Sequence, residues 1–189
     1  MTKLRLAILI SGRGSNMKAL IAACEQPDFP ATVSLVISNV PNAGGIEYAQ
    51  QHGIPTLVIN HKDFENRAAF EAELCAALKD IDLVCLAGFM RILGPTFFQL
   101  NKIPVLNIHP SLLPKHKGLH THEAVLEAGD QVHGCTVHIV TPELDDGDII
   151  VQRQVPVLAE DTSEILAARV LIEEHKAYPE AVRLLAARL

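Results

Sequence analysis

The stretch LRLAILISGRGSN, residues 4–16, passes from an almost wholly apolar segment into a glycine loop and then into a segment of helical period. A short apolar run without polar alternation predicts a strand that is buried on both faces, here Leu4 to Ile10. Strands of this kind form parallel sheets that carry helices on both sides. The stretch therefore predicts the first strand, loop and helix of an open α/β sheet.

Apolar runs and helical-period segments continue to alternate up to about residue 110. The predicted strands are Leu4 to Ile10, Thr32 to Ser38, Pro55 to Ile59, Leu83 to Ala87 and Val105 to His109, and the predicted helices are Ser15 to Cys24, Gly45 to His52 and Asn66 to Lys79. The fold class that this alternation predicts is Rossmann-like, an open and mostly parallel α/β sheet with helices on both faces.

The pattern changes after Pro110 to His120, a loop rich in proline and histidine. The elements predicted beyond it are a short helix near Thr121 to Ala128 and two strands, Gly134 to Val140 and Ile149 to Val155, joined by an acidic turn. A long last helix is predicted to start at a capping Thr162 and to be interrupted at Pro179. The chain is thus expected to add a C-terminal β-hairpin and a long helix to the parallel sheet.

Length and composition predict one globular domain. The 189 residues are 49% hydrophobic and carry a net charge of -6, so nucleic acid is not expected as the main partner. No apolar run reaches the roughly 18 residues of a membrane span or forms a signal peptide, so a cytoplasmic location is expected. Four widely spaced cysteines are expected to be buried free thiols, and they are Cys24, Cys75, Cys85 and Cys135.

The glycine loop, Ser11 to Asn16, lies where the first predicted strand ends, which is the ligand-binding edge of a parallel sheet. Its glycines let backbone N–H groups approach a ligand, and the start of the next helix attracts an anion, so the loop predicts a phosphate site. A dinucleotide fingerprint fits poorly, because its third glycine would fall at Met17 and no acid ends the second strand. The lysine–serine pair of a P-loop is also missing. A plain glycine turn with a serine or asparagine helix cap remains an alternative.

A second polar strand end holds Asn107 and His109, which share one face of their predicted strand because side chains alternate. An amide donor beside an imidazole can stabilise a developing oxyanion and move a proton, as acyl transfer to an amine requires. The acidic turn around Asp145 could hold and charge-stabilise an imidazolium. Each feature alone also has a structural explanation, a core histidine or a solvated turn.

Histidines crowd residues 109–138. Metal binding is one explanation for this crowding, and loop polarity is the simpler one. No zinc-binding signature accompanies these histidines, so no metal site is predicted.

Seven motifs together resemble one family. They are Ile10 to Asn16 (ISGRGSN), Leu86 to Leu93 (LAGFMRIL), Leu106 to Pro114 (LNIHPSLLP), Gly118 to His122 (GLHTH), His133 to His138 (HGCTVH), Asp145 to Gly147 (DDG) and Glu174 to Pro179 (EHKAYP). On these motifs, which span nearly the whole chain, the sequence resembles the phosphoribosylglycinamide formyltransferases, folate-dependent enzymes of purine biosynthesis. The LNIHPSLLP run and the downstream Asp145 are shared with related formyltransferases. The glycine loop and GLHTH narrow the resemblance to this family.

The resemblance implies a formyltransferase fold. It also implies that the chain transfers a formyl group from the co-substrate 10-formyltetrahydrofolate to the amine of 5'-phosphoribosylglycinamide. No metal is implied for this reaction. The matched catalytic positions are Asn107, His109 and Asp145. The matched positions that hold phosphoribosylglycinamide are Gly14, Ser15, Asn16 and Glu174. The matched folate contacts are Arg67, Met90, Arg91, Ile92, Leu93 and Asn107, of which Met90, Ile92 and Leu93 are expected to line a slot for the pterin. A single domain is implied, with a phosphate-binding lobe at about 1–100 and a catalytic and folate lobe at about 101–189.

Other functions fit less well. A methionyl-tRNA formyltransferase would carry an additional C-terminal domain and a formyltetrahydrofolate hydrolase an N-terminal regulatory domain, for which 189 residues leave no room. A nicotinamide-dependent dehydrogenase shares the βα pattern but not the glycine spacing, and a phosphosugar-binding sensor would not need Asn107, His109 and Asp145 together. The chain ends at Leu189, where many relatives carry a further tail, but no matched site residue is lost. The sequence leaves open whether the chain forms a homodimer.

Overall fold

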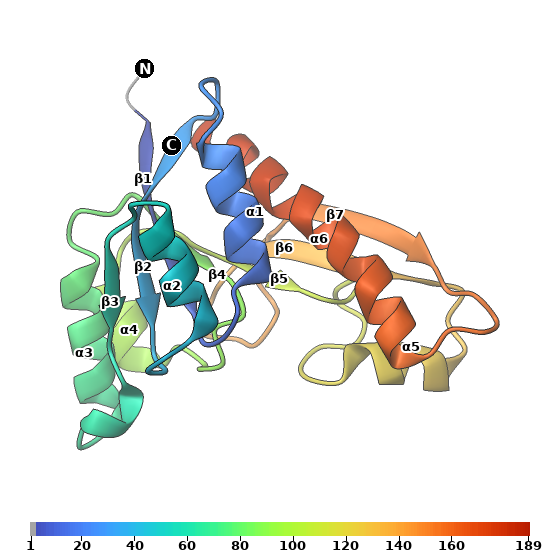
Figure 1. The fold of residues 1–189 in the computed structure, drawn as a ribbon. Helices are drawn as coiled ribbons and strands as arrows, with labels where there is room; N and C mark the ends of the chain where they lie inside the picture. The colour runs from blue at the N-terminus through green and yellow to red at the C-terminus, as the bar shows by residue number, and fades with distance from the viewer. Residues whose placement is uncertain (1–2) are drawn as a thin grey trace. The chain divides into compact units, whose positions relative to one another are not determined.

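The computed structural model describes residues 3–189, which fall into two compact units, one up to Leu106 and one from Asn107 onward. Seven strands follow one another in the sheet in the order β3-β2-β1-β4-β5-β6-β7. The strands are β1 (Leu4–Ile10), β2 (Ala31–Ser38), β3 (Thr56–Val58), β4 (Leu83–Leu86), β5 (Val105–His109), β6 (Val132–Ile139) and β7 (Ile149–Pro156). The helices are α1 (Ser15–Cys24), α2 (Gly44–Gln51), α3 (Arg67–Ala77), α4 (Pro95–Leu100), α5 (Thr121–Ala128) and α6 (Ser163–Ala186), with a 3-10 turn η1 (His61–Asp63) (Figure 1).

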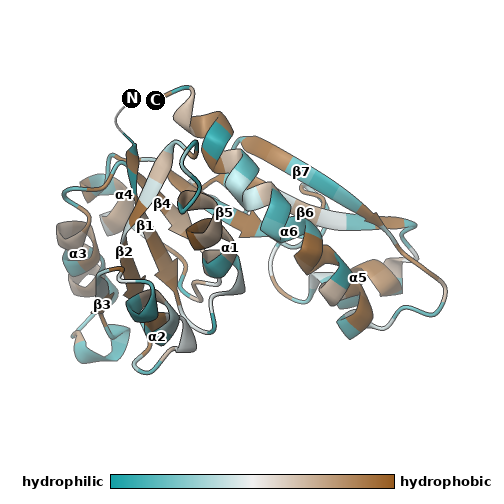
Figure 2. Cartoon of the chain, turned by 45° about the horizontal axis from the view of Figure 1, so that its top comes forward, coloured by the Kyte–Doolittle hydropathy of each residue, from teal (hydrophilic) through white to brown (hydrophobic). Residues whose placement is uncertain are grey.

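The first unit is built on parallel pairing. Strand β1 pairs with β2 and with β4, and β2 pairs with β3, each in parallel. Every residue of β4 is buried, and Figure 2 shows the strands of this unit largely in the brown of hydrophobic residues. Helices α1 and α2 contact β2, whereas α3 and α4 contact each other, and the two pairs lie on opposite faces of the strands (Figure 1). The predicted parallel sheet with helices on both faces is confirmed.

The second unit carries the predicted hairpin and long helix. Strands β6 and β7 pair antiparallel, with Val132 opposite Pro156 at one end. Helix α6 packs on both strands. The side chain of Thr162 accepts a hydrogen bond from the N–H of Ile165, so this residue caps α6 as predicted.

The predicted interruption of the last helix at Pro179 is wrong, because α6 continues through this residue to Ala186. A proline inside a helix removes one backbone hydrogen bond and crowds the preceding turn. Here the residues around it are held by burial, since Tyr178 and Ala181 are fully buried. The packing of this face outweighs the local cost of the proline.

Two short elements, η1 and α4, are not evident from the sequence pattern. Helix α4 has six residues and starts with Pro95. Six residues make fewer than two turns, so an apolar period cannot be recognised in so short a helix.

The helix predicted over Asn66 to Lys79 is shorter in the structure than in the prediction. It is α3, which starts after Asn66, and the side chain of Asn66 accepts the N–H of Ala69. Among residues 3–189, no helix combines the length and the apolar character that a membrane span needs.

Candidate active site

Gly14 ends the glycine loop and is the N-cap residue of α1, with a left-handed φ of 68° that glycine adopts without strain. No side chain makes a capping hydrogen bond at this helix start. The alternative of a serine or asparagine cap is therefore wrong, and the first N–H groups of α1 are not used by such a cap. Ser15 is exposed and Asn16 is buried in the first turn. This helix start has the groups that an anion such as phosphate needs.

The start of α2 approaches the glycine loop closely. The N–H of Gly45 donates to the Gly12 carbonyl at 3.1 Å, and a Cβ on Gly45 would lie 2.5 Å from the Ile10 side chain. At the end of β2, Asn39 is 2% exposed and accepts a hydrogen bond from the Ser11 hydroxyl. In a dinucleotide-binding fold, an acidic residue at the end of the second strand binds the ribose. Here this position holds the buried amide of Asn39, which argues against a nicotinamide-dependent dehydrogenase.

The residues expected to contact folate follow β4. Met90 and Ile92 are 71% and 66% exposed and Arg91 is also exposed, so these side chains can meet a ligand. Leu93 differs from the expectation, because it is 6% exposed and its side chain belongs to the core rather than to an open slot. Arg67 lies beside this segment and donates from Nη2 to the carbonyl oxygen of Ile92.

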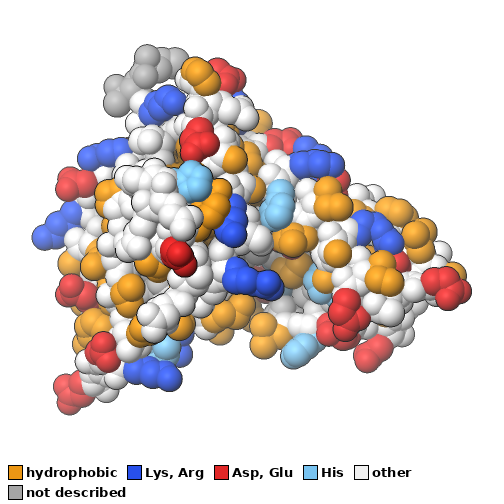
Figure 3. Space-filling model, in the orientation of Figure 1, with side chains coloured by type: hydrophobic (Ala, Val, Ile, Leu, Met, Phe, Trp, Pro, Cys, Tyr) orange, Lys and Arg blue, Asp and Glu red, His pale blue; other side chains and the backbone are white. Residues whose placement is uncertain are grey.

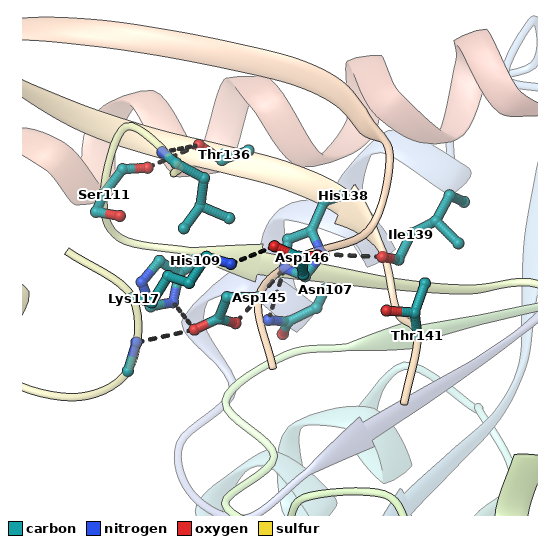
Figure 4. A network of polar contacts seen from close by, with 12 residues as sticks. Asn107, His109, Ser111, Lys117, Thr136, His138, Ile139, Thr141, Asp145 and Asp146 are labelled. Carbon is teal, nitrogen blue, oxygen red and sulfur yellow. Dashed lines mark hydrogen bonds and ion pairs between the residues drawn. The ribbon is translucent and has the colours of Figure 1, made fainter. Parts of the chain in front are cut away.

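His109 ends β5, and its side chain is 7% exposed. Its Nε2 lies 2.9 Å from the carbonyl oxygen of His116. A carbonyl only accepts, so Nε2 carries a hydrogen and the lone pair of the neutral ring is on Nδ1. Nδ1 is therefore the nitrogen that can gain and lose a proton while the ring stays in place, and it faces Asp145 (Figure 4).

Asp145 lies in the turn between β6 and β7, and its Oδ2 is 3.5 Å from Nδ1 of His109. The same oxygen accepts the N–H of Gly118 at 2.9 Å, and Oδ1 lies 3.8 Å from Nε2 of His138. The Asp145 side chain is 7% exposed, and a buried carboxylate favours a positive charge beside it. Its backbone is left-handed, with φ of 49°, a conformation that aspartate tolerates better than most residues. The carboxylate is thus held beside Nδ1 of His109.

His138, on β6, orients the carboxamide of Asn107. Nδ1 of His138 lies 3.0 Å from the carbonyl oxygen of Ile139, so it donates, and Nε2 accepts a hydrogen from Nδ2 of Asn107 at 3.3 Å. Burial lowers the pKa of His138 and keeps the ring neutral, although the Ile139 carbonyl and Asp145 act in the opposite direction. The second hydrogen on Nδ2 of Asn107 can then be donated to a substrate oxygen.

The second unit therefore brings Asn107, His109 and Asp145 together, with His138 as a fourth member that the sequence does not single out (Figure 4). An ion pair between Lys117 and Asp146 further ties the loop after β5 to the turn that carries Asp145. Chemically, the amide and an imidazolium can stabilise negative charge on a carbonyl oxygen, and Nδ1 can pass a proton.

Three of the four histidines of residues 109–138 that lie outside this group have a side-chain partner. Nε2 of His116 lies 2.8 Å from a carboxylate oxygen of Asp130, and Nδ1 of His122 lies 2.9 Å from Nε2 of His133. Within the part of the chain that the structure describes, no three His, Cys, Asp or Glu side chains are placed to hold a metal ion together.

His133 should make the stability of the protein sensitive to acid. Burial, and after it the neighbouring His122, lowers the pKa of His133 from an ordinary value of 6.5 to about 4. Below pH 6.5 the unfolded chain takes up a proton that the folded chain does not, so this contribution to stability falls until about pH 4. The loss from this one group should reach about 3 kcal/mol.

Urea unfolding between about pH 7 and pH 4 checks this expectation. The variant His133→Gln should lose about 3 kcal/mol less than the wild type over that range. His52→Gln, which changes an exposed histidine, should follow the wild type. Equal pH dependence in all three proteins would mean that His133 is not kept neutral by the fold.

Glu174 lies on α6 and is 8% exposed. Burial raises the pKa of the Cys135 thiol on β6 to about 12, and the negative charge of Glu174 adds to this effect.

All four cysteines are free, as expected. Cys85 and Cys135 are buried as predicted, but the prediction of burial is wrong for Cys24 and Cys75, which are half-buried.

Known proteins resemble this chain over most of its length. The sequence pattern of the family described as Formyl transferase matches residues 4–182. The phosphoribosylglycinamide formyltransferase of Escherichia coli (strain K12) is 47% identical over 178 residues, which cover 93% of this chain and 84% of that protein. The trifunctional purine biosynthetic protein adenosine-3 of Bos taurus is 50% identical over 186 residues, which cover 97% of this chain and 18% of that protein. The chain thus spans less than a fifth of the length of this relative.

A solved structure supports the same relationship. The phosphoribosylglycinamide formyltransferase from Brucella melitensis is 49% identical and superposes with a TM-score of 0.94, covering 98% of this chain and 97% of the other.

A mostly parallel sheet with an amide and an imidazole at one strand end, and a carboxylate beside them, is typical of an α/β enzyme. With the family pattern matched over residues 4–182, the chain belongs to the formyl transferase family, in its phosphoribosylglycinamide formyltransferase branch.

Proposed function

We propose that this chain transfers the formyl group of 10-formyltetrahydrofolate to the amine of 5'-phosphoribosylglycinamide, a step of purine biosynthesis. The products are 5'-phosphoribosyl-N-formylglycinamide and tetrahydrofolate. The observation that carries the proposal is the His109 ring, whose Nε2 is held by the His116 carbonyl while Nδ1 faces the Asp145 carboxylate. This arrangement supplies a fixed proton donor where an oxyanion would develop. Family membership supports the choice of the two substrates.

The first chemical step is attack of the neutral amine nitrogen on the formyl carbon. The new N–C bond forms while the π electrons of the carbonyl move onto its oxygen. Nδ2 of Asn107 and protonated Nδ1 of His109 donate hydrogen bonds to this oxygen. Because His109 and Asp145 are shielded from solvent, such hydrogen bonds are stronger than they would be in water.

The second step moves protons and releases tetrahydrofolate. The attacking nitrogen carries a positive charge and must lose a proton, and N10 of the folate must gain one as its bond to carbon breaks. Nδ1 of His109 gives its proton to N10 and recovers one from the attacking nitrogen, directly or through one water. The electrons of the C–N10 bond stay on N10, the carbonyl re-forms, and no net proton is consumed. Asp145 stabilises the imidazolium before and after the exchange.

Substrate recognition is assigned to separate segments of each unit. In the first unit, the glycine loop with Gly14, Ser15 and Asn16 binds the phosphate of phosphoribosylglycinamide. Also in this unit, Arg67 and the side chains of Met90, Arg91 and Ile92 contact folate, whereas the buried Leu93 contacts it only through its backbone. In the second unit, Asn107 contacts the folate and Glu174 contacts the glycinamide end.

Charge supports small molecules rather than nucleic acid as substrates. On the face drawn in Figure 3, Lys and Arg side chains are interspersed with Asp and Glu. A nucleic-acid surface would gather basic side chains along one stripe. Free cysteines are typical of a reducing compartment, and we place the reaction in the cytoplasm.

A formyl-transfer assay with the purified chain tests the proposal. The chain should convert 10-formyltetrahydrofolate to tetrahydrofolate only when phosphoribosylglycinamide is present, and mass spectrometry should find the N-formyl product. Release of formate without formylation of the amine would identify a hydrolase instead. A nicotinamide absorbance on the purified protein, with no formyl transfer, would identify a dehydrogenase.

Ser15 provides a test of the phosphate site. Ser15→Ala removes a hydroxyl donor from the helix start, so the KM for phosphoribosylglycinamide should rise about tenfold, as for a lost hydrogen bond to a charged group. The KM for 10-formyltetrahydrofolate should stay within about twofold. Ser163→Ala, which changes the first residue of α6, is the matched control. If Ser15→Ala raised both KM values equally, the phosphate would bind elsewhere.

A further inference from the structure

The segment that follows β4 presents apolar side chains to solvent and therefore needs another source of order. Met90 and Ile92 are 71% and 66% exposed, so burial anchors this turn only at Leu93, which is 6% exposed. Hydrogen bonds at its two ends have to fix the exposed part. At the first end, the N–H of Met90 donates to the Ser11 hydroxyl at 2.8 Å, and the Ser11 N–H donates to the Gly88 carbonyl at 3.1 Å.

At the second end, one carboxylate accepts three hydrogen bonds. Glu71, on α3, is 2% exposed. Its Oε1 accepts the N–H of Gly94 at 2.6 Å and Nε of Arg67 at 2.9 Å, and its Oε2 accepts the N–H of Phe97 at 3.0 Å. These two N–H groups lie at the start of α4, where no side chain of the helix itself caps them. The buried charge of Glu71 is thus compensated by Arg67 and by the backbone that ends the turn.

Arg67 connects this carboxylate to the turn itself. Its Nε is bonded to Glu71, and its Nη2 donates to the Ile92 carbonyl, two residues before Gly94. Gly94 is packed so closely that a Cβ there would lie 2.7 Å from the guanidinium of Arg67 and 2.7 Å from Oε1 of Glu71. The pair and the turn therefore fit only with glycine at this position.

We propose that Glu71 is a positioning residue for folate binding, acting through Arg67 and the backbone of Gly94 to set the shape of residues 90–94. The inference rests on the proposed function, because it assumes that this turn contacts the folate. In this role Glu71 does not touch a substrate. This role explains why a charged side chain is buried beside exposed apolar residues, because its hydrogen bonds hold the part of the turn that burial does not anchor.

The variant Glu71→Gln tests this role with little change in volume. A glutamine amide has one acceptor oxygen, so one of the N–H groups of Gly94 and Phe97 loses its partner and Arg67 loses its counter-charge. The KM for 10-formyltetrahydrofolate and the Kd for tetrahydrofolate, measured by titration calorimetry, should each rise about tenfold or more. The KM for phosphoribosylglycinamide should stay within about twofold. Glu73→Gln makes the same charge change at an exposed position of α3 and should behave as the wild type.

A second variant reaches the same turn from the other side. Gly94→Ala pushes Arg67 and Glu71 away from the turn and should raise the Kd for tetrahydrofolate in the same way, with a circular dichroism spectrum like that of the wild type. Wild-type affinity for tetrahydrofolate in both folded variants would overturn the positioning role while leaving the proposed function intact. Equal loss of both substrates would also overturn it, since it would indicate a general structural role. A wild-type chain that neither transfers formyl groups nor binds tetrahydrofolate would overturn the proposed function and the inference together.

Discussion

His109→Ala is expected to lower kcat by about 10²- to 10⁴-fold, because it removes a hydrogen bond to the oxyanion and the group that exchanges protons with N10. Both KM values should change little, since the ring acts on atoms that are charged only in the transition state. Steady-state kinetics with each substrate varied in turn measures both quantities.

An effect of His109→Ala on folding has to be distinguished from its effect on catalysis. His109 is buried, so its loss leaves a small cavity and an unpaired His116 carbonyl, which should cost about 1–3 kcal/mol of stability. A circular dichroism spectrum and binding of tetrahydrofolate like those of the wild type would show that the site is intact. A folded variant that retained a third or more of the wild-type kcat would exclude the proposed role of His109.

Asp145→Asn is expected to have the next largest effect, a loss of about 10²-fold in kcat on the scale of acid–base groups. The carboxamide keeps the shape of the side chain and can still accept the Gly118 N–H, but it has no charge to favour an imidazolium. The imidazolium of His109 should then lose its proton at a lower pH than in the wild type. The basic limb of the plot of kcat/KM against pH should therefore move to lower pH in the variant.

The control for Asp145→Asn is Asp148→Asn, an exposed aspartate three residues along the same turn. It should leave both the rate and the pH profile within about twofold of the wild type. An Asp145→Asn variant with an unshifted profile would mean that the carboxylate does not act on the imidazole.

The parts of the fold and site that depend on local signals could be predicted from the sequence. The apolar run of β1 and the glycines after it define the first strand, the loop and α1 without knowledge of the rest of the chain. The two-residue spacing of Asn107 and His109 is a local signal too, because side chains alternate along a strand, and it places both residues on one face of β5.

Contacts between distant segments could not be predicted from local patterns. Asp145 is 36 positions after His109, and only the fold of the β6–β7 hairpin and the Gly118 N–H bring its carboxylate to 3.5 Å from the ring. The role of His138 depends on β6 lying beside β5 in the sheet. A single sequence does not contain that strand order. Alternation along β6 could have placed His138 and Thr136 on one face, but not opposite Asn107.

Tertiary packing is the reason why local sequence rules failed at some positions. The rule that proline interrupts a helix is outweighed in α6 by the burial of Tyr178 and Ala181 around Pro179. Leu93 resembles Met90 and Ile92 in hydropathy, yet it turns into the core while they face solvent. Glu71 has no sequence signal that separates it from the exposed Glu73 on the same helix.

In the proposed reaction His109 and Asp145 act as one unit, with the carboxylate working through the ring. A double-mutant cycle on kcat/KM for phosphoribosylglycinamide measures this most directly, using the wild type, His109→Ala, Asp145→Asn and the double variant. The double variant is expected to be within about threefold of His109→Ala alone, because Asp145 has no ring left to act on. If the two losses instead multiplied, the carboxylate and the imidazole would act independently, and Asp145 would not work through His109.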